Sequence, residues 1–169
     1  SLIVVSLRKD IYFEEGRRIQ GLIKNILKKC EFTSVDEGYI DITEFIQNKN
    51  IKLDKRDEIL KIERFIKKFK QYIYDNSQLT CSVGIGFSKI SAKIASDINK
   101  PNGYFIFKNR EHFLEYIYDK SLAIIPGIGK KTREVLKLFN TTTVFQLYEI
   151  EKNELIRRFG MSKGEYLYN

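Results

Sequence analysis

The chain has few of the residues that build disulfide frameworks and zinc sites. Its 169 residues include two cysteines, Cys30 and Cys81, and one histidine, His112. The cysteines lack the paired spacing of metal ligands, so the chain offers almost no ligands for a zinc site. A disulfide or reactive thiol remains one interpretation. The isolated positions favour the other, two reduced and mostly buried small residues in a cytoplasmic protein.

The sequence also lacks long hydrophobic runs and the composition of a disordered chain. No stretch approaches the roughly 20 apolar residues that a membrane helix needs. The opening Ser-Leu-Ile-Val-Val is too short for a signal peptide, and without an initial Met we expect the sequence to begin inside a longer protein. Two prolines, ten glycines and 43% hydrophobic residues indicate a globular chain of one medium or two small domains.

Positive charge is in excess. The formal net charge is +8 at pH 7 and the pI is about 9.3, which favours a polyanionic partner, either nucleic acid or an acidic membrane surface. The signal is weak alone, because abundant Lys, Ile and Asn are also typical of proteins from AT-rich genomes.

Helical and strand patterns alternate in the first two thirds of the chain. Apolar residues recur at helical spacing in some segments, and short β-branched or aromatic runs occupy others. The expected helices are 10–29, 55–74 and 88–99. The expected strands are two within 31–45 around a tight turn at 36–38, then 79–85 and 104–107, with a loop at 48–54. This order favours an α+β sandwich with helices on one face of a sheet, similar to a ferredoxin-like core without its first strand.

The pattern in the last third of the sequence predicts helices only. The expected helices are 111–118, 130–139, 143–150 and 152–159. The change of pattern predicts a domain boundary near Phe107, with a mixed domain at 1–107 and a small all-helical domain at 108–169.

Two adjacent carboxylates, Asp36 and Glu37, lie at the expected strand turn. Neighbours on a strand point to opposite faces, but at a turn both can converge, and converging carboxylates repel unless a cation lies between them. Hard oxygen ligands of this kind suit Mg²⁺, and two such ions could activate a 3′ hydroxyl and stabilise a leaving pyrophosphate. The dipeptide alone favours an ordinary acidic turn.

The wider string carries a family resemblance. Residues 34–42, Ser-Val-Asp-Glu-Gly-Tyr-Ile-Asp-Ile, closely resemble the Ser-x-Asp-Glu-Ala-Tyr-x-Asp motif of Y-family DNA polymerases, near the DNA polymerase IV branch. The resemblance implies that Asp36 and Glu37 are catalytic ligands of Mg²⁺. Gly38 replaces the usual alanine, a change that we expect to be tolerated, and Asp41 alternates away from the turn and is expected to be structural.

A second motif follows in a lysine-bearing helix. Lys89, Lys93 and Lys100 share one side of the expected helix, and by themselves favour a solvated face. The order and spacing of residues 83–103, ending in Lys-Pro-Asn-Gly, are similar to the family's second palm motif. This implies that Lys100 contacts the triphosphate of the incoming nucleotide, with the other two lysines as weaker candidates. Ser88 stands where the family usually has Asn, which puts a local hydrogen bond in doubt.

A third motif, Ile-Pro-Gly-Ile-Gly-Lys-Lys-Thr, spans residues 125–132 between two expected helices. Two glycines allow a sharp turn whose amides can meet a phosphate at a helix N-terminus. The string resembles the helix-hairpin-helix DNA-backbone clamp in the thumbs of this family, and its spacing excludes a P-loop. The residues expected to contact DNA phosphates are Gly127, Gly129, Lys130, Lys131 and Thr132. A plain interhelical turn is the alternative.

Together the motifs imply a translesion DNA polymerase that uses two Mg²⁺ ions, primer–template DNA and a deoxynucleoside triphosphate. The resemblance assigns 1–107 to an incomplete ferredoxin-like palm, of which 1–7 could instead end the fingers, and 108–169 to a thumb with a helix-hairpin-helix. It implies a cytoplasmic monomer with no membrane partner and leaves open a sliding-clamp contact beyond Asn169. Since the family's first motif and its catalytic aspartate are missing, we expect the chain to be nearly inactive alone.

Two alternatives remain open. A non-catalytic helix-hairpin-helix DNA-binding module would use the glycine motif only, and its acidic turn would be structural. A different palm-type nucleotidyl transferase, such as a cyclase, is disfavoured because it has no reason to carry the phosphate-clamping motif.

Overall fold

The computed structural model describes residues 3, 6–46 and 55–168. The chain divides into two compact units, Ser1–Cys81 and Ser82–Asn169. The loop expected at 48–54 lies outside the described residues, and the palm–thumb boundary expected near Phe107 stays a prediction. No helix in the described part of the chain is long and apolar enough to cross a membrane.

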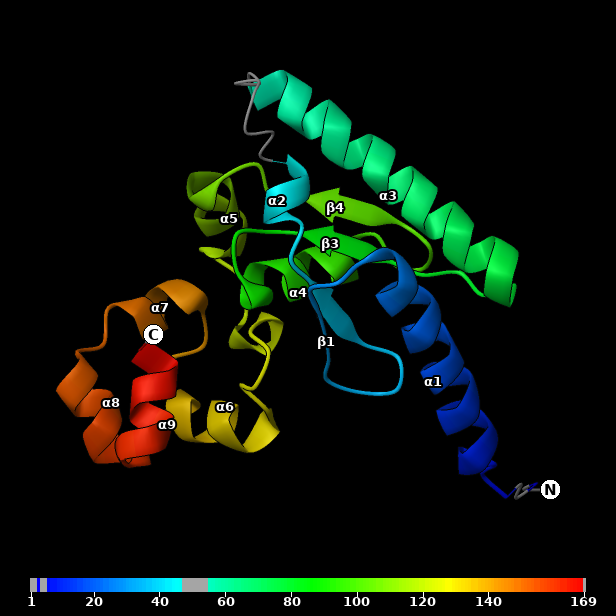
Figure 1. Ribbon diagram of the computed structural model, residues 1–169. Coiled ribbons are helices and arrows are strands. Elements are labelled where there is room, and N and C mark those ends of the chain that lie inside the picture. Colours follow the sequence, from blue (N-terminus) through cyan, green and yellow to red (C-terminus); the bar gives the residue numbers. More distant parts are fainter. Residues whose placement is uncertain (1–2, 4–5, 47–54, 169) are drawn as a thin grey trace. The chain divides into compact units, whose positions relative to one another are not determined.

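The first unit combines helices with one β-hairpin. Its elements are α1 (Lys9–Ile26), β1 (Cys30–Phe32), β2 (Gly38–Ile40), α2 (Thr43–Ile46) and α3 (Lys55–Ser77) (Figure 1). The strands pair antiparallel, with Cys30 opposite Ile40 and Phe32 opposite Gly38. The helix expected at 10–29 is confirmed but ends at Ile26, and the helix expected at 55–74 and the strand turn are confirmed. In α3 the buried apolar residues follow helical spacing and are Ile62, Ile66, Phe69 and Ile73.

One expectation for this unit is wrong. The second strand was expected to continue to residue 45, but residues 43–46 form the short helix α2. The Asp41 carboxylate accepts a hydrogen bond from the Thr43 amide at 2.9 Å, which satisfies a backbone donor at the start of the helix. Hydrogen bonds from the Thr43 hydroxyl and amide hold the pKa of Asp41 below its usual value. Asp41 therefore has the structural role expected from the sequence.

The second unit begins with a βαβ motif. Strands β3 (Val83–Ile85) and β4 (Tyr104–Ile106) pair in parallel, with Val83 opposite Tyr104, and α4 (Lys89–Ile98) connects them. The strand expected over 79–85 forms only at its end, and Leu79 is 48% exposed rather than buried. A Cβ atom on Gly84 would lie 2.1 Å from the Ala92 carbonyl oxygen, so the helix packs directly on the strand backbone.

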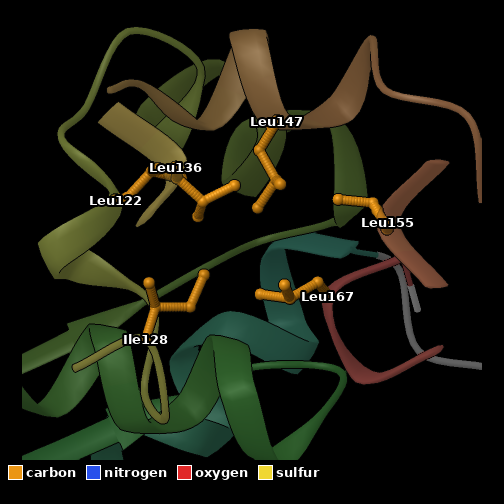
Figure 2. Close-up of a cluster of buried hydrophobic side chains, with 6 residues drawn as sticks. All are labelled: Leu122, Ile128, Leu136, Leu147, Leu155 and Leu167. Atoms are coloured by element: carbon orange, nitrogen blue, oxygen red, sulfur yellow. The ribbon is translucent and has the colours of Figure 1, made fainter. Parts of the chain in front are cut away.

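The rest of this unit is helical, as the sequence predicted. Its elements are α5 (Arg110–Ile117), the 3₁₀ helix η1 (Leu122–Ile124), α6 (Lys130–Lys137), α7 (Val144–Tyr148), α8 (Lys152–Phe159) and α9 (Met161–Tyr168). Six buried side chains point toward one another between these helices and form a common core (Figure 2). They are Leu122, Ile128, Leu136, Leu147, Leu155 and Leu167.

Helix α9 was not expected from the sequence. Its segment contains Gly164 and begins after Gly160, and both residues disfavour a helix. A Cβ atom on Gly164 would lie 2.5 Å from the Ile156 Cα, so this glycine allows α8 and α9 to approach closely. Packing that only glycine permits thus outweighs its low helix propensity.

The described residues are mostly helical with two small sheets, an α+β composition. The strand pairs β1–β2 and β3–β4 belong to different units, so the single sheet with helices on one face stays a prediction.

Candidate functional site

The two candidate metal ligands lie on the connection between β1 and β2. We call residues 33–37 of this connection the acidic bend. The Ser34 hydroxyl donates to Asp36 Oδ1 at 2.7 Å and accepts from the Glu37 amide at 3.1 Å. The Thr33 amide donates a hydrogen bond to the Glu37 carbonyl at 3.0 Å, which closes the bend. Both acids are exposed, and their backbone is held by one serine that the sequence analysis did not single out.

Helix α1 supports the acidic bend from one side. The Gln20 side-chain amide donates to the Ser34 carbonyl at 3.1 Å. One turn earlier, Gly16 is buried, and a Cβ atom there would lie 2.3 Å from Val35 Cγ2 and 2.6 Å from the Val35 carbonyl oxygen. A glycine and a glutamine four residues apart thus share the helix face that contacts the bend.

An open hollow of about 560 Å³ lies where α1 meets the acidic bend. Its lining combines aromatic, cationic and polar side chains. The lining residues are Phe13, Arg17, Gln20, Phe32, Thr33, Ser34 and Val35.

The donor set of the acidic bend suits a hard cation. Asp36 and Glu37 offer carboxylate oxygens, which Mg²⁺ prefers, together with water and substrate phosphates. Within residues 3, 6–46 and 55–168, no group of three or more His, Cys, Asp or Glu side chains is arranged to hold a metal. The two acids therefore fit part of a magnesium site.

The candidate phosphate-binding lysine belongs to the second unit. Lys100 follows α4, its side chain is 51% exposed, and it forms an ion pair with Asp97 Oδ1 at 2.5 Å. Lys93 lies 3.7 Å from the other oxygen of Asp97. Asp97 is thus paired with two of the three lysines that the sequence analysis grouped.

The serine that departs from the family's usual asparagine caps α4. Ser88 accepts a hydrogen bond from the Ser91 amide at 3.2 Å, and the Ser91 hydroxyl accepts from the Ser88 amide at 3.0 Å. This reciprocal capping box satisfies two amide donors at the helix start. Ser88 was expected to be an N-cap, and that expectation is confirmed.

The glycine motif forms a tight turn directly before α6. We call residues 125–129 the glycine hairpin. The Ile128 amide donates to the Ile125 carbonyl at 3.1 Å, and Gly127 has φ +82°, so Pro126 and Gly127 occupy the positions that they favour in a type II turn. Ile128 is 3% exposed and anchors the turn in the helical core, as Figure 2 shows.

The residues expected to contact phosphates are mostly on the surface. Gly127, Gly129, Lys130 and Lys131 are exposed and Thr132 is half-buried. Gly129 is the N-cap of α6 and has no side chain that could accept from the first amides of the helix. These amides have no acceptor within the helix either. The Lys130 side chain is 85% exposed and lies 3.9 Å from Glu134.

Side chains hold three successive carbonyl oxygens of the glycine hairpin. The Tyr166 hydroxyl donates to the Pro126 carbonyl, and the Lys163 ammonium donates to the Gly127 carbonyl at 2.9 Å. Arg133 donates to the Ile128 carbonyl at 2.6 Å. Sequence reasoning missed all three residues, and two of them lie on α9, the helix that it did not predict.

Comparisons with known proteins agree with these motifs. A model of the impB/mucB/samB family matches residues 1–97, which is more than half of the chain. The chain belongs to this family. The resemblance to Y-family DNA polymerases is thereby confirmed.

Similar proteins of this family cover nearly all of the chain. DNA polymerase IV of Fusobacterium nucleatum subsp. nucleatum is 46% identical over 167 residues, covering 99% of this chain and 45% of that protein. DNA polymerase IV of Metallosphaera sedula is 30% identical over 98% of this chain and 44% of its own length. The chain therefore spans a little under half the length of these relatives.

Solved structures of DinB and of Dbh DNA polymerase share the fold. DinB from Sulfolobus solfataricus superposes with a TM-score of 0.78 at 29% identity, covering 98% of this chain and 46% of that chain. The insertion ternary complex of Dbh DNA polymerase gives a TM-score of 0.79 at 29% identity, covering 98% of this chain and 45% of that chain. The chain thus has the α+β fold of Y-family polymerase domains.

Proposed function

We propose that the whole protein carries out template-directed DNA synthesis past damaged bases, as a translesion DNA polymerase. The observation that carries this proposal is the acidic bend, where Asp36 and Glu37 lie in a matching motif of a chain 46% identical to a DNA polymerase IV. The substrates would be primer–template DNA and a deoxynucleoside triphosphate. We further propose that the protein acts as a monomer in the cytoplasm.

The acidic bend would hold the metal ions of the reaction. Bound Mg²⁺, two ions in the complete site, would activate the 3′ hydroxyl of the primer and stabilise the leaving pyrophosphate. Asp36 and Glu37 would bind the ions through their carboxylates. The Ser34 hydroxyl, which donates to Asp36 Oδ1, would restrict the orientation of that carboxylate.

Lys100 would bind the triphosphate of the incoming nucleotide. In the free chain its ammonium is paired with Asp97, which lies within reach of Lys93 as well. A partner shared by two lysines lowers the cost of moving Lys100 to a phosphate, because Asp97 retains a cation. A point charge at the phosphates would then offset the negative charge that develops during transfer.

Residues 1–107 would form the palm, ferredoxin-like but without its first strand, and residues 108–169 the thumb. The glycine hairpin and α6 would act as a helix-hairpin-helix that binds the DNA backbone, because peptide amides at a helix N-terminus bind phosphates. The exposed Lys130 and Lys131 would add charge there. A backbone clamp tolerates any sequence, as a polymerase requires.

Primer extension by the full-length protein tests the proposal. Replacing Asp36 and Glu37 by Asn and Gln removes charge with little change of shape, and should lower extension at least about a hundredfold, since charge-stabilising groups typically contribute that much. Duplex binding should be retained. Asp10→Asn on α1 serves as the control for loss of an exposed acid.

Two outcomes would count against the proposal. Undiminished extension by the double variant would refute the metal role of the acidic bend. DNA binding without any extension by the unchanged full-length protein would favour the non-catalytic helix-hairpin-helix module. The same assay on the 169-residue chain, which lacks a counterpart of the family's first motif, should show little or no synthesis.

A further inference from the structure

The side chains that hold the glycine hairpin have a directional consequence. A trans peptide unit is planar, so the carbonyl of one residue and the amide N–H of the next point in opposite directions. Fixing a carbonyl oxygen therefore fixes the direction of the following amide. Both the Pro126–Gly127 and the Ile128–Gly129 peptides are trans.

Applied to the hairpin, this relation selects two amides. Tyr166 holds the Pro126 carbonyl, so the Gly127 amide points away from α9. Arg133 holds the Ile128 carbonyl, so the Gly129 amide points away from the Arg133 side chain. The peptide between them differs, because Lys163 holds its carbonyl while its amide, that of Ile128, is used inside the turn.

The amides oriented in this way belong to two exposed glycines, Gly127 in the turn before α6 and Gly129 at its N-cap. We infer that Tyr166 and Arg133 are positioning residues for phosphate binding, holding the Gly127 and Gly129 amides in the direction needed to donate to DNA. This role rests on the proposed DNA-binding function of the glycine hairpin. Neither residue needs to touch the DNA to exert it.

Gly127 shows why an external support is needed. Gly127 adopts φ +82° and has no side chain to restrict its flanking peptides, and glycine loses more conformational freedom on folding than other residues. The space beside it is filled by Tyr166, whose hydroxyl oxygen would lie 2.5 Å from a Cβ atom on residue 127. The tyrosine therefore restricts the peptide both by contact and by its hydrogen bond.

Tyr166→Phe is the sharpest test, because it removes one hydroxyl and no charge. Tyr148→Phe is the matched control, since Tyr148 is 81% exposed on α7. Binding of the 169-residue chain to a fluorescent primer–template duplex is measured by anisotropy at several salt concentrations. We expect Tyr166→Phe to weaken binding about three- to tenfold, the range for one hydrogen bond, and Tyr148→Phe to leave it unchanged.

The salt dependence checks that the lost interaction is uncharged. A peptide amide neutralises no phosphate charge and releases no counterion, so Tyr166→Phe should weaken binding without changing the slope of log K against log salt. Melting of both variants well above the assay temperature excludes general loss of stability as the cause. Equal affinity of the two Tyr→Phe variants for the duplex would overturn the inference.

Amide chemical shifts of the DNA-free chain give an independent readout. Tyr166→Phe should shift the Gly127 amide most, whereas Arg133→Lys, which keeps the charge, should shift the Gly129 amide most. Unmoved glycine amides would overturn the inference even if binding weakens. If the unchanged chain binds no duplex, the proposed function of the hairpin and the positioning role both fail, while shifted amides would still show that the side chains orient the peptides.

Discussion

A methyl group on residue 16 would enter space that the acidic bend already occupies. In Gly16→Ala the new Cβ atom would lie 2.6 Å from the Val35 carbonyl oxygen and 2.3 Å from Val35 Cγ2, whereas ordinary contacts begin near 3.4 Å. The first of these atoms belongs to the backbone and cannot rotate away. The bend must therefore move by most of an ångström, or α1 must shift.

The same helix offers a matched control. Gly21 lies five residues later in α1, and a Cβ atom there would meet nothing within 4 Å. Gly→Ala inside a helix gains about 1 kcal/mol from backbone propensity at either position. Crowding a packed site costs about 1–3 kcal/mol, and only Gly16→Ala incurs that cost.

The two variants should therefore change the stability of the first unit in opposite directions, or one should change it and the other should not. We expect Gly21→Ala to stabilise the first unit by about 1 kcal/mol, and Gly16→Ala to leave it unchanged or to destabilise it by up to about 2 kcal/mol. Native-state hydrogen exchange of the α1 amides is the suitable assay, because a whole-chain signal averages the two units. If Gly16→Ala stabilises α1 as much as Gly21→Ala does, the close packing of helix and bend is refuted.

Two further predictions concern the second unit. Ser88→Ala should destabilise it by about 1 kcal/mol through loss of the capping box, measured by hydrogen exchange of the α4 amides, and an unchanged exchange rate would contradict the cap. Hydrogen bonds from Arg157 and Arg158 lower the pKa of Glu154 from 4.5 to about 2. The stability that this cluster contributes should thus be complete above about pH 4.5 and be lost as the pH falls through 2. Glu154→Gln should remove that pH dependence. A titration midpoint near 4.5 for the Glu154 carboxyl in NMR would contradict the lowered pKa.

The helices that the sequence predicted best are those with a regular apolar stripe. Helix α3 buries Ile62, Ile66, Phe69 and Ile73 at helical spacing, and such a pattern is readable without any knowledge of the partner surface. The β1–β2 turn and the N-cap Ser88 were also readable, because turns and caps depend on residues close in sequence.

The elements that were missed depend on contacts distant in sequence. Helix α9 forms although it contains Gly164, since that glycine lets it approach α8. The strand expected at 79–85 shortens to Val83–Ile85, where pairing with Tyr104–Ile106 exists. Helix and strand propensities alone predict neither the close approach of α9 to α8 nor the shortening of the strand.

The residues of the candidate site also fall into those predicted from local sequence and those that depend on distant contacts. Asp36, Glu37 and the glycine hairpin were found from local motifs. Their supports were not, because Gln20 contacts Ser34 from 14 residues away and Tyr166 contacts Pro126 from 40 residues away. Ser34 was the exception that local reasoning could have found, since a serine two residues before an aspartate often bonds its own turn.

The distance along the chain between Pro126 and Tyr166 has a consequence for biosynthesis. A ribosome adds Pro126 40 residues before it adds the tyrosine whose hydroxyl donates to the Pro126 carbonyl. A nascent or prematurely terminated polypeptide that stops before Tyr166 would contain the complete Pro-Gly-Ile-Gly string without the hydroxyl that holds it. The Pro-Gly-Ile-Gly string alone therefore does not ensure the backbone geometry that it has in the 169-residue chain.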